Sequence, residues 1–167
     1  MKKLMLLLLL IGMPFAAGAQ TLKFGYLSYQ EALKAMPDYA IAQQNLKDLK
    51  SKYDAEMKRV EDEFNKKYEL FLDGQKDFAP AIRQKRQAEL QEMMDKNLAF
   101  KQEARRLLDQ AERDAYAPLK TKLNEILQRI ARNRGFAFIL NTDHDALPYV
   151  DPLMGENITA IVKDAFK

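Results

Sequence analysis

The sequence predicts a mostly helical α+β protein, in which a long helical-hairpin arm projects from a small β body. Three observations predict this class. After Pro37 the chain contains no glycine or proline until Gly74, and this stretch carries a regular apolar stripe. A second helical stretch begins near Pro80. Short apolar runs with aromatic residues lie near the two ends, so we expect these strands to meet in space as one body.

Residues 1–19 have the layout of a secretory signal peptide. Lys2 and Lys3 precede an apolar run over residues 4–13, and a small-x-small cleavage site ends at Ala19. A membrane anchor is the less favoured alternative, because the run is shorter than the ~20 residues of a spanning helix and a proline follows it. We therefore expect export, with cleavage after Ala19.

The composition excludes several classes of protein. The chain has no cysteine and one histidine, which leaves little for thiolate chemistry, metal binding or general acid–base catalysis. Removing Lys2 and Lys3 from 27 basic residues leaves 25 against 24 acidic ones, a net charge of +1. Nucleic-acid binding needs a concentrated basic surface, which a nearly neutral exported chain does not offer. We expect a protein that is not an enzyme and needs no cofactor or metal.

The first arm helix has an eleven-residue apolar repeat. Its stripe has spacings of 3, 4, 4, 3, 4, 4 and 3 residues and comprises Leu46, Leu49, Tyr53, Met57, Val60, Phe64, Tyr68 and Phe71. Eleven residues over three turns is close to the period of a straight helix, so the stripe stays on one face. A helix of about 35 residues reaches roughly 50 Å, which is too long for a compact globule.

The second arm helix is expected from about Pro80 to Ala117, and its apolar period is less regular. We assign no single register to its face, which comprises Ile82, Leu90, Met93, Met94, Leu98, Phe100, Ala104, Leu107, Leu108, Ala111 and Ala115. Pro118 removes a helical hydrogen bond, so we expect a kink or a restart there. The resumed helix ends at Gly135, a residue suited to the left-handed conformation that follows a helix.

The body is expected to hold three strands. They cover residues 23–27, residues 136–140 and residues 146–150, and the last two form a β-hairpin. Ser28 and Glu31 have the spacing of a capping box at the start of a short helix. Asn157 is placed to cap a final helix.

We divide the chain into a signal peptide (1–19), a first part of the body (20–36), an arm (37–117) with its tip near 73–80, and a second part of the body (118–167).

The body holds only about 60–70 residues without a disulfide, and hydrophobic cores of that size are only marginally stable alone. Contacts between subunits commonly stabilise such small cores, so we expect the body to bind other copies of the chain. The residues expected to be buried in this oligomeric body are Phe24, Tyr26, Phe136, Phe138 and Ile139.

The whole chain after the signal peptide resembles the Skp/OmpH family of periplasmic chaperones. The resemblance rests on the order and spacing of several segments, namely Phe24 to Leu27, Met36 to Tyr39, Pro118 to Leu140, Leu147 to Pro152 and Asn157 to Thr159. Asn157 stands where the family usually has aspartate. The resemblance implies a periplasmic homotrimer whose β-barrel body joins three arms around a cavity for unfolded outer-membrane proteins, without use of ATP. Some members are described as binding lipopolysaccharide, but no residue of this chain can be matched to such a motif.

Large apolar side chains toward the tip are candidates for client binding. They are Met57, Phe64, Tyr68, Phe71, Phe78, Met93, Met94 and Phe100. Methionine is flexible and polarisable, which suits a surface that accepts unlike partners. The alternative is that these residues form the contact between the two arm helices, and the sequence leaves both open. A structural coiled-coil adaptor or spacer of the envelope is the alternative function. The holdase is favoured because only the first arm helix has a regular repeat.

Two polar features have ordinary explanations that we favour. The tip cations Lys76, Arg83, Lys85 and Arg86 are compatible with weak contact with an anionic membrane, lipopolysaccharide or an acidic client, and solvated charge is the simpler interpretation. His144 lies between two aspartates in a predicted turn. Adjacent turn residues rarely converge on one metal ion, so we expect a polar turn.

Overall fold

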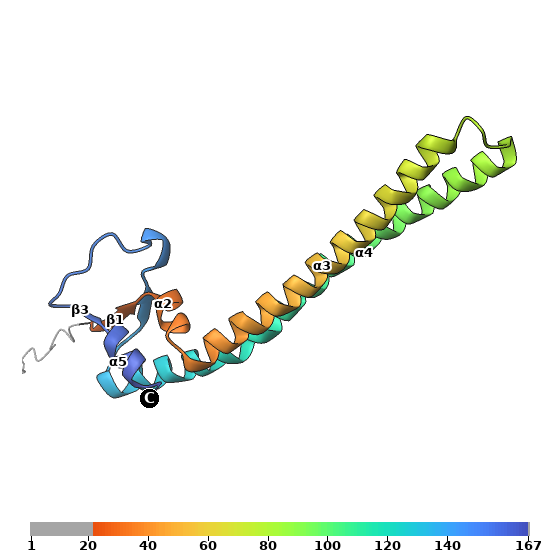
Figure 1. The fold of residues 1–167 in the computed structure, drawn as a ribbon. Coiled ribbons are helices and arrows are strands. Elements are labelled where there is room, and N and C mark those ends of the chain that lie inside the picture. The colour runs from red at the N-terminus through yellow and green to blue at the C-terminus, as the bar shows by residue number, and fades with distance from the viewer. Residues whose placement is uncertain (1–21, 167) are drawn as a thin grey trace, which may run out of the picture.

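The computed structural model describes residues 22–166, so the predicted signal peptide lies outside the described residues. Two long antiparallel helices form an arm, and a small β sheet with short helices forms a body at one end (Figure 1). The predicted fold, mostly helical with a small β body and a long helical arm, is confirmed.

The arm consists of α3 (Pro37–Gly74) and the first two thirds of α4 (Pro80–Arg134). Each helix has a proline in its first turn, where the missing N–H would have no helical partner. A kink or a restart was predicted at Pro118; the helix does not restart there, because α4 runs through Pro118 without a break. The lost bond would have used the carbonyl of Asp114, which is exposed and accessible to water.

The contact between α3 and α4, hereafter the seam, explains the irregular pattern of the second helix. Its α4 positions recur at spacings of 3, 4, 3, 4, 3, 4 and 4 residues, and none of them is exposed: Leu90, Met93, Asn97, Phe100, Ala104, Leu107, Ala111 and Ala115. A polar residue, Asn97, occupies one of these positions and hides the repeat from an analysis of apolar residues. Ala104 is buried, and its small side chain allows close approach of the two helices.

The end of α4 was predicted at Gly135, and the structure explains the choice of glycine. Gly135 has φ of 69°, a left-handed conformation that costs other residues energy. Its N–H donates to the carbonyl of Arg132, and the N–H of Phe136 donates to the carbonyl of Ala131 at 2.9 Å. This pair of bonds satisfies the last helical carbonyls and turns the chain toward the sheet.

The sheet contains β1 (Phe24–Leu27), β2 (Ile139–Asn141) and β3 (Gly155–Asn157), in the order β2-β1-β3. Both pairings are parallel. The predicted hairpin of residues 136–140 with residues 146–150 was therefore wrong. Pro148 lies at the centre of the expected third strand and cannot donate a ladder hydrogen bond. The chain after β2 instead forms a short 3-10 turn (Asp143–Asp145) and a loop that returns on the other side of β1.

One face of the sheet packs on helices to form the core of the body. Leu27 of β1 contacts a cluster of buried residues from α2 (Tyr29–Lys34), α4 and α5 (Thr159–Asp164), which includes Leu33, Met36, Leu123, Ile126, Ile158 and Val162. Ser28 caps α2, and its side chain accepts from the N–H of Glu31 at 3.1 Å. The Glu31 carboxylate pairs with Lys163 of α5, in place of the return bond of a capping box. Asn157 accepts from the N–H of Thr159 at 3.0 Å, at the start of α5.

Candidate functional site

The predicted client-binding residues differ in their accessibility. Tyr68 and Met94 are exposed on the arm, and Phe71 is buried, with 7% of its surface accessible. The others are half-buried: Met57, Phe64, Phe78, Met93 and Phe100. The sequence left two roles open for these residues, and the geometry distinguishes between them. Phe71 is buried against Phe78 at the tip, whereas Tyr68 and Met94 present apolar surface to solvent.

Aromatic contacts close the hairpin at the tip. The rings of Phe71 and Phe78 lie 6.2 Å apart between centroids, and the Arg86 guanidinium lies 4.3 Å from the Phe78 ring centre. A Cβ atom built on Gly74 would approach the Phe78 ring to 2.6 Å, so glycine lets this ring lie against the helix end. Arg83 donates to the carbonyl of Gln75 at 3.1 Å. Two of the four tip cations therefore hold the turn itself.

Further along α3, Phe64 stacks on Tyr68 with ring centroids 5.9 Å apart and planes within 7°. Closer to the body, Tyr53 of α3 meets Phe100 of α4 across the seam at 6.3 Å. Phe64 is thus covered on one side by Tyr68, and Phe100 is covered by the opposite helix.

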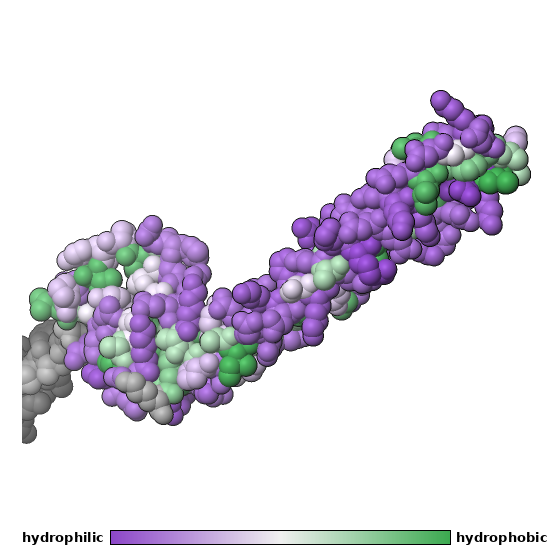
Figure 2. Space-filling model, in the orientation of Figure 1, coloured by the Kyte–Doolittle hydropathy of each residue, from purple (hydrophilic) through white to green (hydrophobic). Residues whose placement is uncertain are grey.

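Several exposed apolar residues of the arm were absent from the predicted site. On the outer half of the arm they are Leu70, Leu72, Ile82 and Leu98, and Ile41 is exposed at the body end of the arm. Leu70 and Leu72 lie outside the periodic stripe, and an off-stripe leucine on a helix is the sequence signal that would have identified them. Apolar side chains gather at the tip, while much of the arm between tip and body is hydrophilic (Figure 2).

Two open grooves flank the arm helices near the body, and a third lies near the tip. The largest, with a volume of ≈ 810 Å³, is hereafter the shaft groove. Its apolar lining comes from Leu46, Met57, Leu98, Ala104, Leu108 and Tyr116. The second groove near the body measures ≈ 490 Å³ and the tip groove ≈ 420 Å³. The shaft groove thus provides the most room for a bound chain.

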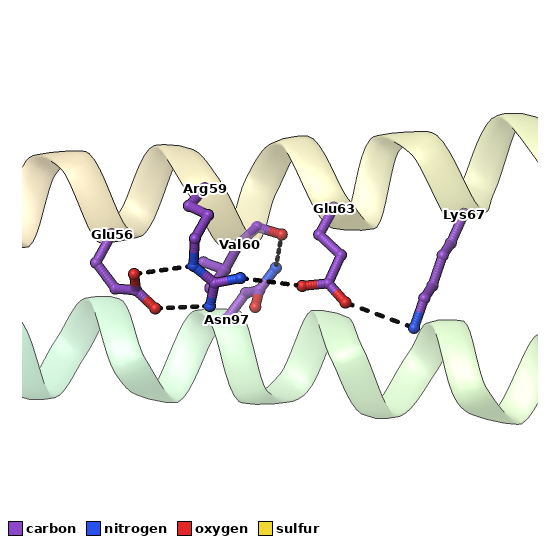
Figure 3. Close-up of polar contacts among 6 residues, drawn as sticks. All are labelled: Glu56, Arg59, Val60, Glu63, Lys67 and Asn97. Atoms are coloured by element: carbon purple, nitrogen blue, oxygen red, sulfur yellow. Dashed lines mark hydrogen bonds and ion pairs between the residues drawn. The ribbon is translucent and has the colours of Figure 1, made fainter.

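A charged network lies along α3 in the middle of the arm (Figure 3). Arg59 pairs with Glu56 at 2.7 Å and with Glu63 at 3.3 Å, and Glu63 also pairs with Lys67 at 3.6 Å. Hydrogen bonding to Arg59 lowers the pKa of the Glu56 carboxyl, and the same bond raises the pKa of the Arg59 guanidinium. Both groups therefore stay charged near neutral pH, which keeps this part of the arm surface polar.

Comparison with known proteins agrees with this architecture. The family described as "Outer membrane protein (OmpH-like)" matches residues 23–166. The chain belongs to the OmpH-like family. Its fold is similar to that of a solved structure from Caulobacter crescentus CB15, which is described as an OmpH-like candidate outer membrane chaperone. The TM-score is 0.70 at 16% sequence identity, over 87% of this chain and 83% of that one. The search of curated proteins gave no match.

The OmpH-like body has a second sheet face with aromatic side chains. Phe24 and Phe138 stack at 5.5 Å between ring centroids, on the face opposite Leu27, and 41% of the Phe138 surface is accessible. Tyr26 lies on the same face by strand alternation. Two of the predicted subunit-contact residues, Phe136 and Ile139, instead pack against the core of their own chain. Phe24, Tyr26 and Phe138 are therefore the better candidates for contact with another subunit.

Within residues 22–166, no helix is both long and apolar enough to cross a membrane. The same part of the chain shows no group of three or more histidine, cysteine, aspartate or glutamate side chains placed to hold a metal ion. His144 instead lies 3.4 Å from the side-chain nitrogen of Gln30, in the polar turn that follows β2.

Proposed function

We propose that this OmpH-like protein is an ATP-independent periplasmic holdase, which binds unfolded outer-membrane proteins along its arm and prevents their aggregation. The observation that carries the proposal is the set of large apolar side chains exposed on the outer half of an otherwise charged arm: Tyr68, Leu70, Leu72, Ile82, Met94 and Leu98. Exposed apolar surface on a soluble helix favours association with another apolar surface. The family and the solved structure named as a chaperone support the same role.

The arm suits weak and mobile binding. Each half-exposed side chain buries only part of its surface on contact, which stabilises a complex by about 1 kcal/mol. Charged residues between the apolar side chains prevent the arm itself from collapsing into aggregates. A client held by several such contacts can shift along the arm, because no single contact dominates the affinity.

The proposal includes a homotrimer, in which three arms surround the client. The sheet has two edge strands, β2 and β3, and a face that carries Phe24, Tyr26 and Phe138. Open edges and apolar faces favour pairing between copies. Trimerisation would multiply the weak contacts of one arm by three and raise the effective concentration of the apolar side chains around the client.

The proposal also includes export to the periplasm, with cleavage after Ala19. It rests on the charged start, apolar run and small-x-small site of the first residues. The intact mass of protein recovered from the periplasm tests it. A recovered species that retains residues 1–19 would contradict it.

The decisive test of function is an aggregation assay without nucleotide. A membrane β-barrel protein unfolded in urea is diluted into buffer with and without the purified mature chain, and light scattering is followed. We expect scattering to be suppressed at about one chaperone oligomer per client. Undiminished scattering would contradict the holdase and favour the alternative of a structural adaptor or spacer in the envelope.

A further inference from the structure

The shaft groove combines an apolar floor with a rim of both charges. Its floor residues come from both arm helices, and among them Leu98 is the most exposed. Lys47, Lys101 and Arg105 lie along the rim together with Asp109 and Glu112. The groove begins in the middle of the arm and ends at Tyr116, which stacks on Tyr39 where the arm meets the body.

We propose that the shaft groove seats one extended segment of the unfolded client, with apolar side chains on the floor and polar ones toward the rim. This inference rests on the proposed holdase function and names the surface and the conformation that the client adopts on it. The occupant is a stretch of outer-membrane β-strand sequence, in which apolar and polar residues alternate.

The length of the groove fits a short strand. The α3 residues that line it run from Gln43 to Met57, which spans about 21 Å at 1.5 Å per residue. An extended chain rises about 3.3 Å per residue, so roughly six client residues occupy the groove and three of them face the floor. Membrane strands have about ten residues, so one strand fills the groove and leaves a few residues over.

The sequence of the client favours the extended conformation. Alternating residues place every apolar side chain on one face of a strand, whereas the same sequence in a helix distributes them around the axis. Only the extended segment can direct all its apolar groups to a single floor. Its outer backbone remains accessible to water, so it binds weakly and can be released to pair with other strands.

The charges of the rim match polar residues of either sign. Lys50 is already paired with Asp54 at 2.8 Å, while the remaining rim carries cations and carboxylates on the same groove. The tip groove differs, because Lys67, Lys85 and Arg86 line it against one acid, Glu89. It also includes Phe71, which is buried and packs on Phe78 of the tip turn. The shaft groove is therefore the better match for a client of mixed charge.

Two matched substitutions test the assignment. Leu98→Ser removes a side chain of the shaft groove that is 56% exposed, and Ile41→Ser removes a side chain of similar size from the second groove near the body, where it is 61% exposed. Both lie on helices, and neither substitution introduces a helix breaker. The measurement is the affinity for a fluorescein-labelled, urea-unfolded membrane β-barrel protein, followed by anisotropy. We expect Leu98→Ser to weaken binding by about fivefold and Ile41→Ser by less than about twofold.

The outcomes separate this inference from the function on which it rests. If the unchanged protein does not bind the client, both the proposed holdase function and the assignment of the shaft groove are overturned. If it binds, but both variants lose affinity equally or neither loses any, only the groove assignment is overturned. A photo-cross-linking amino acid at position 98 provides a readout independent of variant stability. We expect adducts with the client, and adducts only with another copy of this chain would overturn the inference.

Discussion

The side-chain amide of Asn97 donates to the main-chain carbonyl of Val60 at 3.1 Å and joins α4 to α3 in the middle of the seam (Figure 3). The carbonyl lies inside α3, where helical geometry already provides it with a partner, so Asn97 adds a second bond. A polar residue at one core position of a helix pair typically fixes register at some cost in stability. In an arm this long, such a bond opposes sliding of one helix past the other.

Asn97→Leu should therefore stabilise the arm. We expect the free energy of unfolding to rise by about 1 kcal/mol, because leucine adds apolar contact and leaves the Val60 carbonyl with its helical partner. Urea denaturation followed by circular dichroism measures the change. Gln91→Leu, outside the seam, is the control and should change stability by less than about 0.5 kcal/mol. A destabilised Asn97→Leu variant would show that the amide bond outweighs its cost.

Phe71 and Tyr68 should respond differently to truncation, although they lie one turn apart on α3. Phe71 is 7% exposed and contacts Phe78, so Phe71→Ala should lower the free energy of unfolding by about 2–3 kcal/mol. Tyr68 is exposed, so Tyr68→Ala should change stability by less than about 0.5 kcal/mol and weaken client binding. Thermal unfolding and client anisotropy measure the two effects. Equal loss of stability in both variants would show that the Tyr68 side chain is packed as closely as that of Phe71.

The arm could be predicted because long amphipathic helices reveal themselves by period alone. All but one of the α3 stripe residues avoid full exposure, and Tyr68 is the exception. The register of α4 could not be predicted, because the pattern was read from apolar residues and Asn97 holds a core position. The sequence also could not show which apolar residues at the tip are buried and which are exposed, because this depends on how the Phe78 ring packs against Gly74.

The sheet was less predictable because its strands are short and pair over long sequence distances. The second strand was expected over residues 136–140, but it begins three residues later and ends one residue later. The third strand was expected over residues 146–150, but it lies at Gly155–Asn157. Strand β3 contains Gly155, where an added Cβ would lie 2.4 Å from a Val150 methyl and 2.8 Å from the Phe24 ring. Such a close approach requires glycine, yet a glycine in sequence suggests a turn.

The carboxylate of Asp143 connects the turn after β2 to the start of α2. It accepts from the Ser28 hydroxyl and, at 3.0 Å, from the N–H of Gln30. Burial alone would raise the pKa of Asp143, but these hydrogen bonds, the Asn141 side chain and the nearby His144 together lower the pKa below its ordinary 3.8. Because the pKa is lowered in the folded state, the charged carboxylate stabilises that state at pH values above 3.8. This stability is lost as the pH falls through the folded-state pKa.

Asp143→Asn should reproduce this loss at neutral pH. We expect the free energy of unfolding to fall by about 1 kcal/mol, because asparagine offers one acceptor oxygen in place of two. The difference from the unchanged protein should shrink as the pH falls below 3.8, where the aspartate itself becomes protonated. Urea denaturation at several pH values measures it, with Asp145→Asn as the control. A difference that persists unchanged in acid would exclude the charge of Asp143 as its cause.

The proposed homotrimer depends on the open sheet face, and Phe138 is the residue that tests it. Its ring stacks on Phe24 within 18° of parallel while remaining 41% exposed, so a second subunit can bury it further. Phe138→Asp places a charge where that contact would form, and burying an unpaired charge costs several kcal/mol. We expect sedimentation equilibrium to return the mass of a single chain at micromolar concentration, with helicity retained because the arm is distant.

Client binding should weaken when the oligomer is lost, since one arm alone provides only a few weak contacts. Leu98→Asp on the arm is the control and should keep the oligomer. If Phe138→Asp also keeps it, the subunits are joined by the sheet edges rather than by this face.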